Sequence, residues 1–231
     1  MATGSAIARS EYDLPGGGSL IAGDAAYKPI TRTVVIMPAD GVQADDAWAR
    51  RIIAWLTAGR GRLIVRHSPD TYRIAQFDDA PTYGAKIWPL GGIQVKCKMQ
   101  GLCHASHATG LTAATSGGKA SITAAYATAL AAPLDVTIAP TSGTITAAEI
   151  RTGGKALALG GLTLTAGHVL AYFAGDAHQG EAARLEIDGA ACFDRVTAWA
   201  QLAAPPGGAI EVTVTGGEAS VTATLRGRWP G

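Results

Sequence analysis

The stretch WARRIIAWLTAGRGRLIV, residues 48–65, decides the fold of the first half of the chain. Its large apolar residues recur with the spacing of one helix face: Trp48, Ile52, Trp55 and Leu56. We therefore predict a helix over residues 48–57, capped by Asp45, with both tryptophans in the core. Gly59 closes this helix, and the chain continues through Gly61 into a short strand at residues 63–65.

Strand patterns lie on both sides of this helix. Residues 1–28 lack a clear pattern, so the first ordered strand is expected at residues 30–37, and another follows at residues 72–77. The clearest strand covers residues 93–100, in which apolar residues alternate without exception with polar ones. Its polar face is either solvated or an interface, and we predict it as an assembly interface made of Gln94, Lys96, Lys98 and Gln100.

The composition shifts to small residues after Gly101, and this change predicts the domain organisation. We expect a first domain over residues 1–104, a linker over residues 105–118 and a second domain over residues 119–231. From Ala120 onward, short strands alternate with Gly and Pro turns about 8–12 residues apart, which is typical of a β-sandwich or small barrel. The predicted fold class is mainly β, with an N-terminal α+β domain of a sheet plus one helix.

Composition and charge exclude several classes of protein. With 48% hydrophobic and 16% charged residues over 231 positions, the chain differs from disordered sequences. A net charge of +1 gives no overall field that would attract nucleic acid or an anionic membrane, so we expect no sequence-specific nucleic-acid binding. No apolar run approaches the length of a membrane span, and the N-terminus lacks the regions of a signal peptide.

The cysteines and histidines give one candidate metal site. Thiolate and imidazole ligands for zinc are offered by Cys97, Cys103, His104 and His107. Their spacing lacks a second ligand pair, and Cys97 belongs to the apolar face of its strand, so we expect no metal. The odd number of cysteines, Cys192 being the third, does not describe a disulfide framework and favours a reduced, cytoplasmic origin.

Catalytic motifs are also weak. No serine lies in a G-x-S-x-G elbow, and the adjacent carboxylates Asp78 and Asp79 are better explained by a loop. The histidines His168 and His178 stand next to turn glycines. The Gly-Gly-Lys sequence ending at Lys155 lacks the remainder of a phosphate-binding loop and is interpreted as a turn. We expect no catalytic residue and no cofactor, and the chain is predicted not to be an enzyme.

The order of these features carries a resemblance to a known family. A helix ending in Trp-Leu is followed by a Gly-rich turn, a short strand, an acidic Pro-Asp turn and a Tyr-containing strand. The matching residues are Trp55, Leu56, Gly59, Gly61, residues 63–65, Ser68, Pro69, Asp70 and Tyr72. This series resembles the belt domain of the distal tail proteins of long-tailed phages. The family usually has a further N-terminal strand and turn before a Pro-Gly loop, here Pro15 and Gly16, which this chain is expected to lack.

The second domain continues the resemblance to the C-terminal, galectin-like β-sandwich of that family. The matching positions are Ile138, Ala139, Pro140, Gly143, Gly153, Gly154, Lys155, Leu157, Leu159, Trp199, Leu202, Pro206, Gly207, Arg226, Arg228 and Trp229. One departure lies between the domains, where the family's aromatic dipeptide is replaced by residues 101–104. The resemblance thus covers both domains in order.

The resemblance implies a structural protein of the virion tail tip, made in the host cytoplasm. In this family the belt domains form a hexameric ring that joins the tail tube protein to the tail-tip hub protein and surrounds the DNA passage. Tape-measure and receptor-binding proteins are further expected partners in the baseplate of a phage or prophage. The alternative is a glycan-binding β-sandwich for attachment to a host surface, with four candidate aromatics: Tyr126, Tyr172, Trp199 and Trp229.

Overall fold

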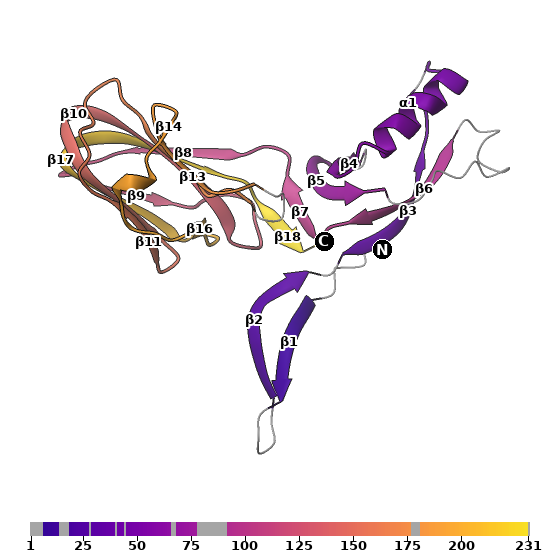
Figure 1. Ribbon diagram of the computed structural model, residues 1–231, viewed down its shortest axis with the longest axis horizontal. Helices are drawn as coiled ribbons and strands as arrows, with labels where there is room; N and C mark the ends of the chain where they lie inside the picture. Colours follow the sequence, from indigo (N-terminus) through magenta and orange to yellow (C-terminus); the bar gives the residue numbers. More distant parts are fainter. Residues whose placement is uncertain are drawn as a thin grey trace. The chain divides into compact units, whose positions relative to one another are not determined.

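The computed structural model describes residues 7–13, 19–27, 29–39, 41–43, 45–65, 68–77, 92–176 and 181–230 (Figure 1). The described residues are mainly in strands, with one α-helix, which confirms the predicted fold class. The chain divides into two compact units, Met1–Cys103 with Pro230–Gly231 and His104–Trp229. Within the described residues, no helix has the length and apolar character needed to cross a membrane.

The first unit contains two strands that the sequence did not predict. β1 (Ile7–Asp13) and β2 (Ser19–Tyr27) pair in antiparallel fashion and form a two-stranded sheet of their own. The expectation that ordered structure begins at residue 30 is therefore wrong. Both segments are rich in small and polar residues, so they lack the alternation of apolar residues from which a strand is recognised.

A second sheet of the first unit carries the helix. This sheet includes β3 (Ile30–Ile36), β4 (Gly61–Val65), β5 (Ser68–Gln76) and β6 (Ile93–Met99), and it continues into β7 (Leu102–Ala105) and β18 (Arg228–Pro230). The helix α1 (Asp46–Leu56) packs against it. β6 lies between β3 and β5, and β4 pairs with β5. The predicted helix and the strand at residues 93–100 are confirmed to within two residues. The predicted cap is confirmed as well, because the Asp45 carboxylate accepts a hydrogen bond from the Trp48 amide at 2.7 Å.

One face of this sheet holds the core of the first unit. Trp48 and Ala49 of α1 pack with Ile93 of β6, with Ile36 and Ile52 at the margin. A second cluster on the same sheet contains Ala75, Cys97 and Met99. The alternation of β6 places every second residue on this buried face, as the sequence predicted.

The second unit is built on two long antiparallel strands, β10 (Ala132–Thr152) and β17 (Ala209–Leu225). Shorter strands join this pair: β8 (Thr109–Ala114), β9 (Lys119–Thr123), β11 (Lys155–Leu159), β12 (Leu170–Phe173), β13 (Arg184–Ile187), β14 (Ala190–Ala191), β15 (Val196–Ala198) and β16 (Ala203–Ala204). β8 and β12 join one half of the long pair, whereas β9 and β11 join the other half. The two halves enclose one hydrophobic core, which makes the unit a β-sandwich (Figure 1).

A glycine corner lets the long pair pass from one layer to the other. The β10–β17 register shifts between Pro140 and Ala147, where Gly143 pairs with Gly217 and lies close to Gly216. The φ angles of Gly143 and Gly216 are +70° and +92°. A Cβ on Gly216 would lie 2.4 Å from the Thr144 carbonyl oxygen. Glycine is therefore needed at this bend for both its backbone angle and the close approach of the two strands.

The structure corrects the expected linker. Residues 109–114 form β8, which pairs with β17 and places Leu111 and Ala113 against the sandwich core. The run of small residues is therefore part of a sheet. The side chains of Ala and Thr are small enough to pack beside those of the neighbouring strand. The chain crosses between the two units within β7 (Leu102–Ala105) and again within β18 (Arg228–Pro230), so the boundary falls at Cys103 and His104.

Candidate assembly surfaces

The predicted polar face of β6 exists as one continuous surface. Lys96 and Lys98 are exposed, and Gln94 and Gln100 are half-buried at either end. In the sheet, Lys98 stands opposite Thr31 of β3 and Gln76 of β5, so the face extends over neighbouring strands. The structure thus brings the four predicted residues together on the side opposite the buried face. Whether this surface is an interface or only solvated stays a prediction.

The helix stripe is only partly buried. Trp48 is 6% exposed, as predicted, but Trp55 is 50% exposed, and its assignment to the core is wrong. The buried face is centred between Trp48, Ile52 and Leu56, and at 3.6 residues per turn Trp55 points about 60° away from that centre. The Trp55 ring packs instead against Phe77, with ring centroids 5.6 Å apart. A large aromatic side chain is therefore left at the surface.

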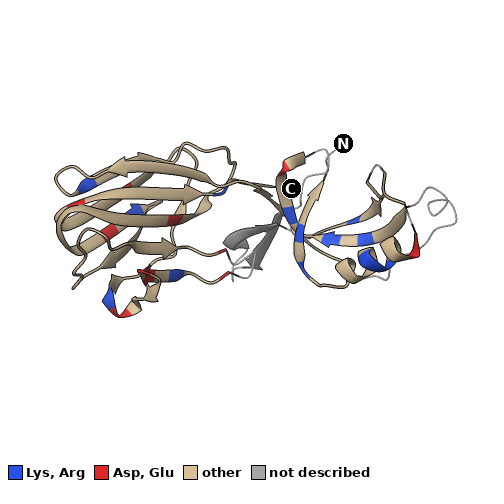
Figure 2. Ribbon diagram, turned by 90° about the horizontal axis from the view of Figure 1, so that it is seen from above, with Lys and Arg blue, Asp and Glu red and all other residues tan. Residues whose placement is uncertain are grey.

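The charges of residues 29–103 in the first unit are uneven, which the near-neutral total of the chain conceals. Among its described residues from 29 to 103, basic side chains occur at Arg32, Arg50, Arg51, Arg60, Arg62, Arg73, Lys96 and Lys98. Acidic side chains in the same described residues occur at Asp45, Asp46 and Asp70. Figure 2 shows blue segments along the helix and the strands of this unit. An excess of this kind favours partners with acidic surfaces.

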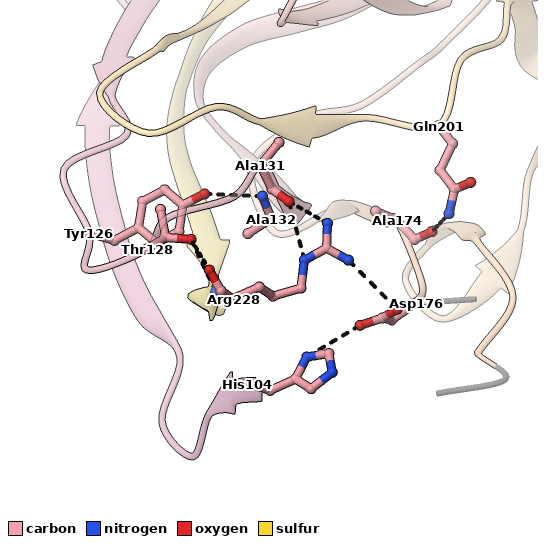
Figure 3. A network of polar contacts seen from close by, with 9 residues as sticks. All are labelled: His104, Tyr126, Thr128, Ala131, Ala132, Ala174, Asp176, Gln201 and Arg228. Carbon is pink, nitrogen blue, oxygen red and sulfur yellow. Dashed lines mark hydrogen bonds and ion pairs between the residues drawn. The ribbon is translucent and has the colours of Figure 1, made fainter. Parts of the chain in front are cut away.

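A buried polar network lies in the second unit (Figure 3). His104, 1% exposed, holds its Nδ1 atom 3.7 Å from an Asp176 oxygen, and the Arg228 guanidinium lies 3.9 Å from the other oxygen. Arg228 also donates to the Ala131 carbonyl oxygen, through Nε at 3.2 Å and through Nη2. Burial lowers the pKa of Arg228, and the Asp176 carboxylate opposes this shift. His104 lies where the chain enters this unit, and Arg228 lies close to where the chain leaves it. The Asp176 carboxylate therefore connects these two points.

The loop beside this network is fixed by hydroxyl groups. The Tyr126 hydroxyl donates to the Ala204 carbonyl oxygen at 2.8 Å and accepts from the Ala132 amide at 3.1 Å. The Thr128 hydroxyl accepts from the Arg228 amide at 3.0 Å. These contacts join the loop before β10 to backbone groups of β10, β16 and β18, which is a structural role. This network could not be predicted from the sequence, because its members are far apart along the chain.

The residues considered for zinc do not gather around one point. Cys97 is fully buried in the first unit, Cys103 is half-buried, and His107 is exposed. His104 belongs to the network with Asp176. Within the part of the chain that the structure describes, no group of three or more His, Cys, Asp or Glu side chains could hold a metal ion.

The other chemical candidates have structural explanations or fall outside the described residues. Asp78, Asp79 and His178 lie outside them. His168 contacts Asp188 at 2.6 Å, and the same carboxylate accepts from the Val169 amide. These hydrogen bonds lower the pKa of Asp188 and fix a surface turn. The Gly-Gly turn before Lys155 joins β10 to β11 with φ of +55° and +75°, which confirms its interpretation as a turn.

Of the four aromatics considered for glycan binding, one stands out. Tyr172 is fully buried, and its hydroxyl accepts from the Leu202 amide at 2.9 Å. Trp199 is 45% exposed and packs against Phe193, itself 48% exposed, with ring centroids 5.3 Å apart. Tyr126 belongs to the loop described above, and Trp229 is half-buried. The partner of Trp199, Phe193, was missed in the sequence because it belongs to a separate short 3-10 helix, Phe193–Arg195.

Comparisons with known proteins bear on the fold. No family model matches the chain, and no curated protein matches it either. Among solved structures it is similar to the SPP1 Dit protein, whose crystal structure is described as a paradigm of the hub adsorption apparatus in phages that infect Gram-positive bacteria. The TM-score is 0.63 with 12% identity, over 98% of this chain and 90% of that one. The chain therefore has the fold of the SPP1 Dit protein across both units.

A second similarity is to a chain in the structure of the phage P2 baseplate in its activated conformation with Ca. Here the TM-score is 0.48 with 9% identity, over 97% of this chain and 87% of that one.

Proposed function

We propose that this chain is the distal tail protein of a long-tailed phage or prophage and that it acts as a structural part of the tail tip, not as an enzyme. The observation that carries the proposal is the fold of the SPP1 Dit protein, shared over 98% of this chain and 90% of that one. The ordered series of turn and strand motifs from Trp55 to Trp229 supports the same assignment from the sequence alone.

Ring formation is the first part of the proposed function, and the first unit has features that favour self-association. The β1–β2 pair forms a sheet of two strands, and such an isolated pair is only marginally stable in water without a packing partner. β3 pairs with a single neighbour among the described strands, which leaves an open edge. A neighbouring copy that covers these features through a heterologous interface produces a closed ring, which in this proposal is a hexamer.

The ring joins the tail tube protein to the tail-tip hub protein and surrounds the DNA passage. In this arrangement the β6 face with Lys96 and Lys98 contacts a subunit or a partner, because an exposed pair of lysines on a regular sheet offers charge complementarity. The second unit attaches tape-measure or receptor-binding components. In this proposal the protein is made in the host cytoplasm and then acts as a structural connector at the virion tail tip.

Light scattering and negative-stain microscopy of the full chain test this proposal. The purified protein should form rings, either alone or after addition of the tail tube and hub proteins made from neighbouring genes. A tape-measure gene on one side and a tail-tip gene on the other are expected in the genome. A monomer that stays inert with both proteins would contradict the proposed function.

A second candidate function is glycan binding by the β-sandwich, which the exposed Trp199–Phe193 pair favours. Half-exposed aromatic rings next to Asp194 and Arg195 offer both an apolar surface and hydrogen-bonding groups. A glycan array with the full chain and with Trp199→Ala tests this candidate. Binding to a defined saccharide that Trp199→Ala removes would support it, and an array without a hit would eliminate it.

A further inference from the structure

Trp55 lies at the rim of a hollow in the surface of the first unit. The hollow has a volume of about 90 Å³ and is lined by Trp55, Ala58, Gly59, Arg60, Gly61, Arg62, Leu63, Ala75 and Phe77. A water molecule takes up roughly 30 Å³ in the liquid, so the hollow has room for only a few water molecules. This is the size of one apolar side chain. Apolar residues and glycines make up most of its lining, together with the two arginines Arg60 and Arg62.

The composition of this surface is that of an energetically important contact. Trp, Tyr and Arg are the residues that most often dominate binding energy at protein interfaces. Here Trp55 packs on Phe77, and the Arg62 guanidinium lies 4.8 Å from the centre of the Tyr72 ring. A half-exposed tryptophan with an aromatic neighbour is therefore poised to contact a partner.

The charges around the hollow select the partner's chemistry. Arg60 and Arg62 line it, and Arg51 lies one helical turn before Trp55 on the same side of α1. The acidic residues Asp45 and Asp46 are at the opposite end of the helix, roughly 14 Å away at 1.5 Å per residue. The described charges at this rim are thus all basic, and they complement carboxylates.

The strand beside the hollow determines the shape of the partner. β4 pairs with β5 and with no other described strand, and its residue Ile64 is exposed. An open strand edge binds an extended chain by adding it as a further strand. Alternate side chains of such a chain would point to the same face, so that one of them can reach the hollow.

We infer that this surface, defined by Trp55, Phe77, Arg60, Arg62 and the edge of β4, docks an extended acidic segment of a partner protein. One apolar side chain of the segment packs against Trp55 and Phe77, and flanking carboxylates pair with Arg60 and Arg62. The inference goes beyond ring formation, because it concerns a peptide-binding edge that operates on a single copy of the chain.

Selection from a library of random linear peptides with the full-length protein tests the inference. The enriched peptides should combine Asp or Glu with an apolar residue. Their affinity, measured by fluorescence polarisation, should fall by about tenfold or more for Trp55→Ala and for the double variant Arg60→Glu, Arg62→Glu. Hydrogen exchange should show β4 amides that become protected when the peptide is added.

The matched control is the double variant Lys96→Glu, Lys98→Glu, which makes the same charge change on β6. It should bind the enriched peptides with unchanged affinity, and thermal unfolding should show that all variants are folded. Enriched peptides without acidic residues, peptides that bind every variant equally, or no enrichment at all would overturn the inference. If Trp55→Ala instead abolishes self-association while no acidic peptide is enriched, the hollow is a contact between copies and the inference fails although the proposed function stands.

Discussion

The two helix tryptophans, seven positions apart, have opposite roles in the first unit. Trp48 packs with Ile93 in the core, whereas Trp55 has half of its surface in solvent. We expect Trp48→Ala to lower the free energy of unfolding by about 3–5 kcal/mol, as removal of a buried large aromatic does. Trp55→Ala should lower it by less than about 1 kcal/mol. Thermal and denaturant unfolding of the two variants measures the difference, and equal losses would contradict the assigned orientation of α1.

The error over Trp55 shows what periodicity can and cannot predict for single residues. The spacing of apolar residues correctly identified a helix and its buried side at Trp48 and Leu56. It could not tell that the centre of the buried face runs between Trp48 and Leu56, because this depends on how the helix lies on the sheet. Residues at the margin of an apolar stripe are therefore the ones for which tertiary packing decides burial.

Glu218 gives the second unit a dependence on pH. Its carboxylate accepts hydrogen bonds from the Thr115 hydroxyl and the Gly118 amide, and these lower the pKa of Glu218. Since the pKa is lower in the folded state, this stabilisation is present above the ordinary glutamate pKa of about 4.3 and is lost as the pH falls below it. We expect Glu218→Gln to reduce the loss of thermal stability between neutral and acidic pH.

Glu211→Gln, an exposed position on the same strand, is the control for Glu218→Gln. It should leave the pH profile of the unfolding temperature nearly unchanged. A Glu218→Gln profile that runs parallel to that of the unmodified chain at every pH would show that the carboxylate contributes nothing to acid sensitivity.

Among the elements, the bend in β10 and β17 is the feature on which the β-sandwich depends. Gly216→Ala would place a Cβ near the Thr144 carbonyl oxygen in addition to straining a backbone with φ of +92°. Gly167 has a similar φ of +98° with nothing within 4 Å of the added atom. We expect Gly167→Ala to cost about 1–2 kcal/mol and Gly216→Ala clearly more. Denaturant unfolding compares them, and equal costs would show that the strands at the corner separate freely.

The ease with which each element could be predicted follows from the pattern it carries. β6 was recognised because its apolar and polar residues alternate, and the turn between β10 and β11 was recognised because two glycines form it. β8 was mistaken for a linker and β1 was missed, since small or polar residues form strands here without the apolar alternation. The Asp176 network could not be predicted, because only folding brings its distant residues together.

On the scale of the whole molecule, the near-neutral charge conceals a basic first unit, and this shapes the expected assembly. The second unit carries more acidic than basic residues, including exposed ones such as Glu211 and Asp194. Copies of the chain therefore have complementary surfaces available for heterologous contacts. Salt screens the attraction between charges that are further apart than the Debye length. Which surfaces attract one another therefore depends on the charge of each unit and not on the net charge of the whole chain.

Reversal of the two β6 lysines tests which surface assembles. In the double variant Lys96→Glu, Lys98→Glu, the buried face of β6 is unchanged, so the unfolding free energy of the isolated chain should move by less than about 1 kcal/mol. If this face contacts a neighbouring copy or the tube or hub protein, reversal opposes like charges there, and ring formation measured by light scattering should fail. The matched double variant Lys119→Glu, Lys155→Glu, on exposed positions of the second unit, should assemble normally. Normal assembly of the β6 variant with both partners would mean that Lys96 and Lys98 are solvated, and the open edge of β3 would then become the surface that must hold the ring together.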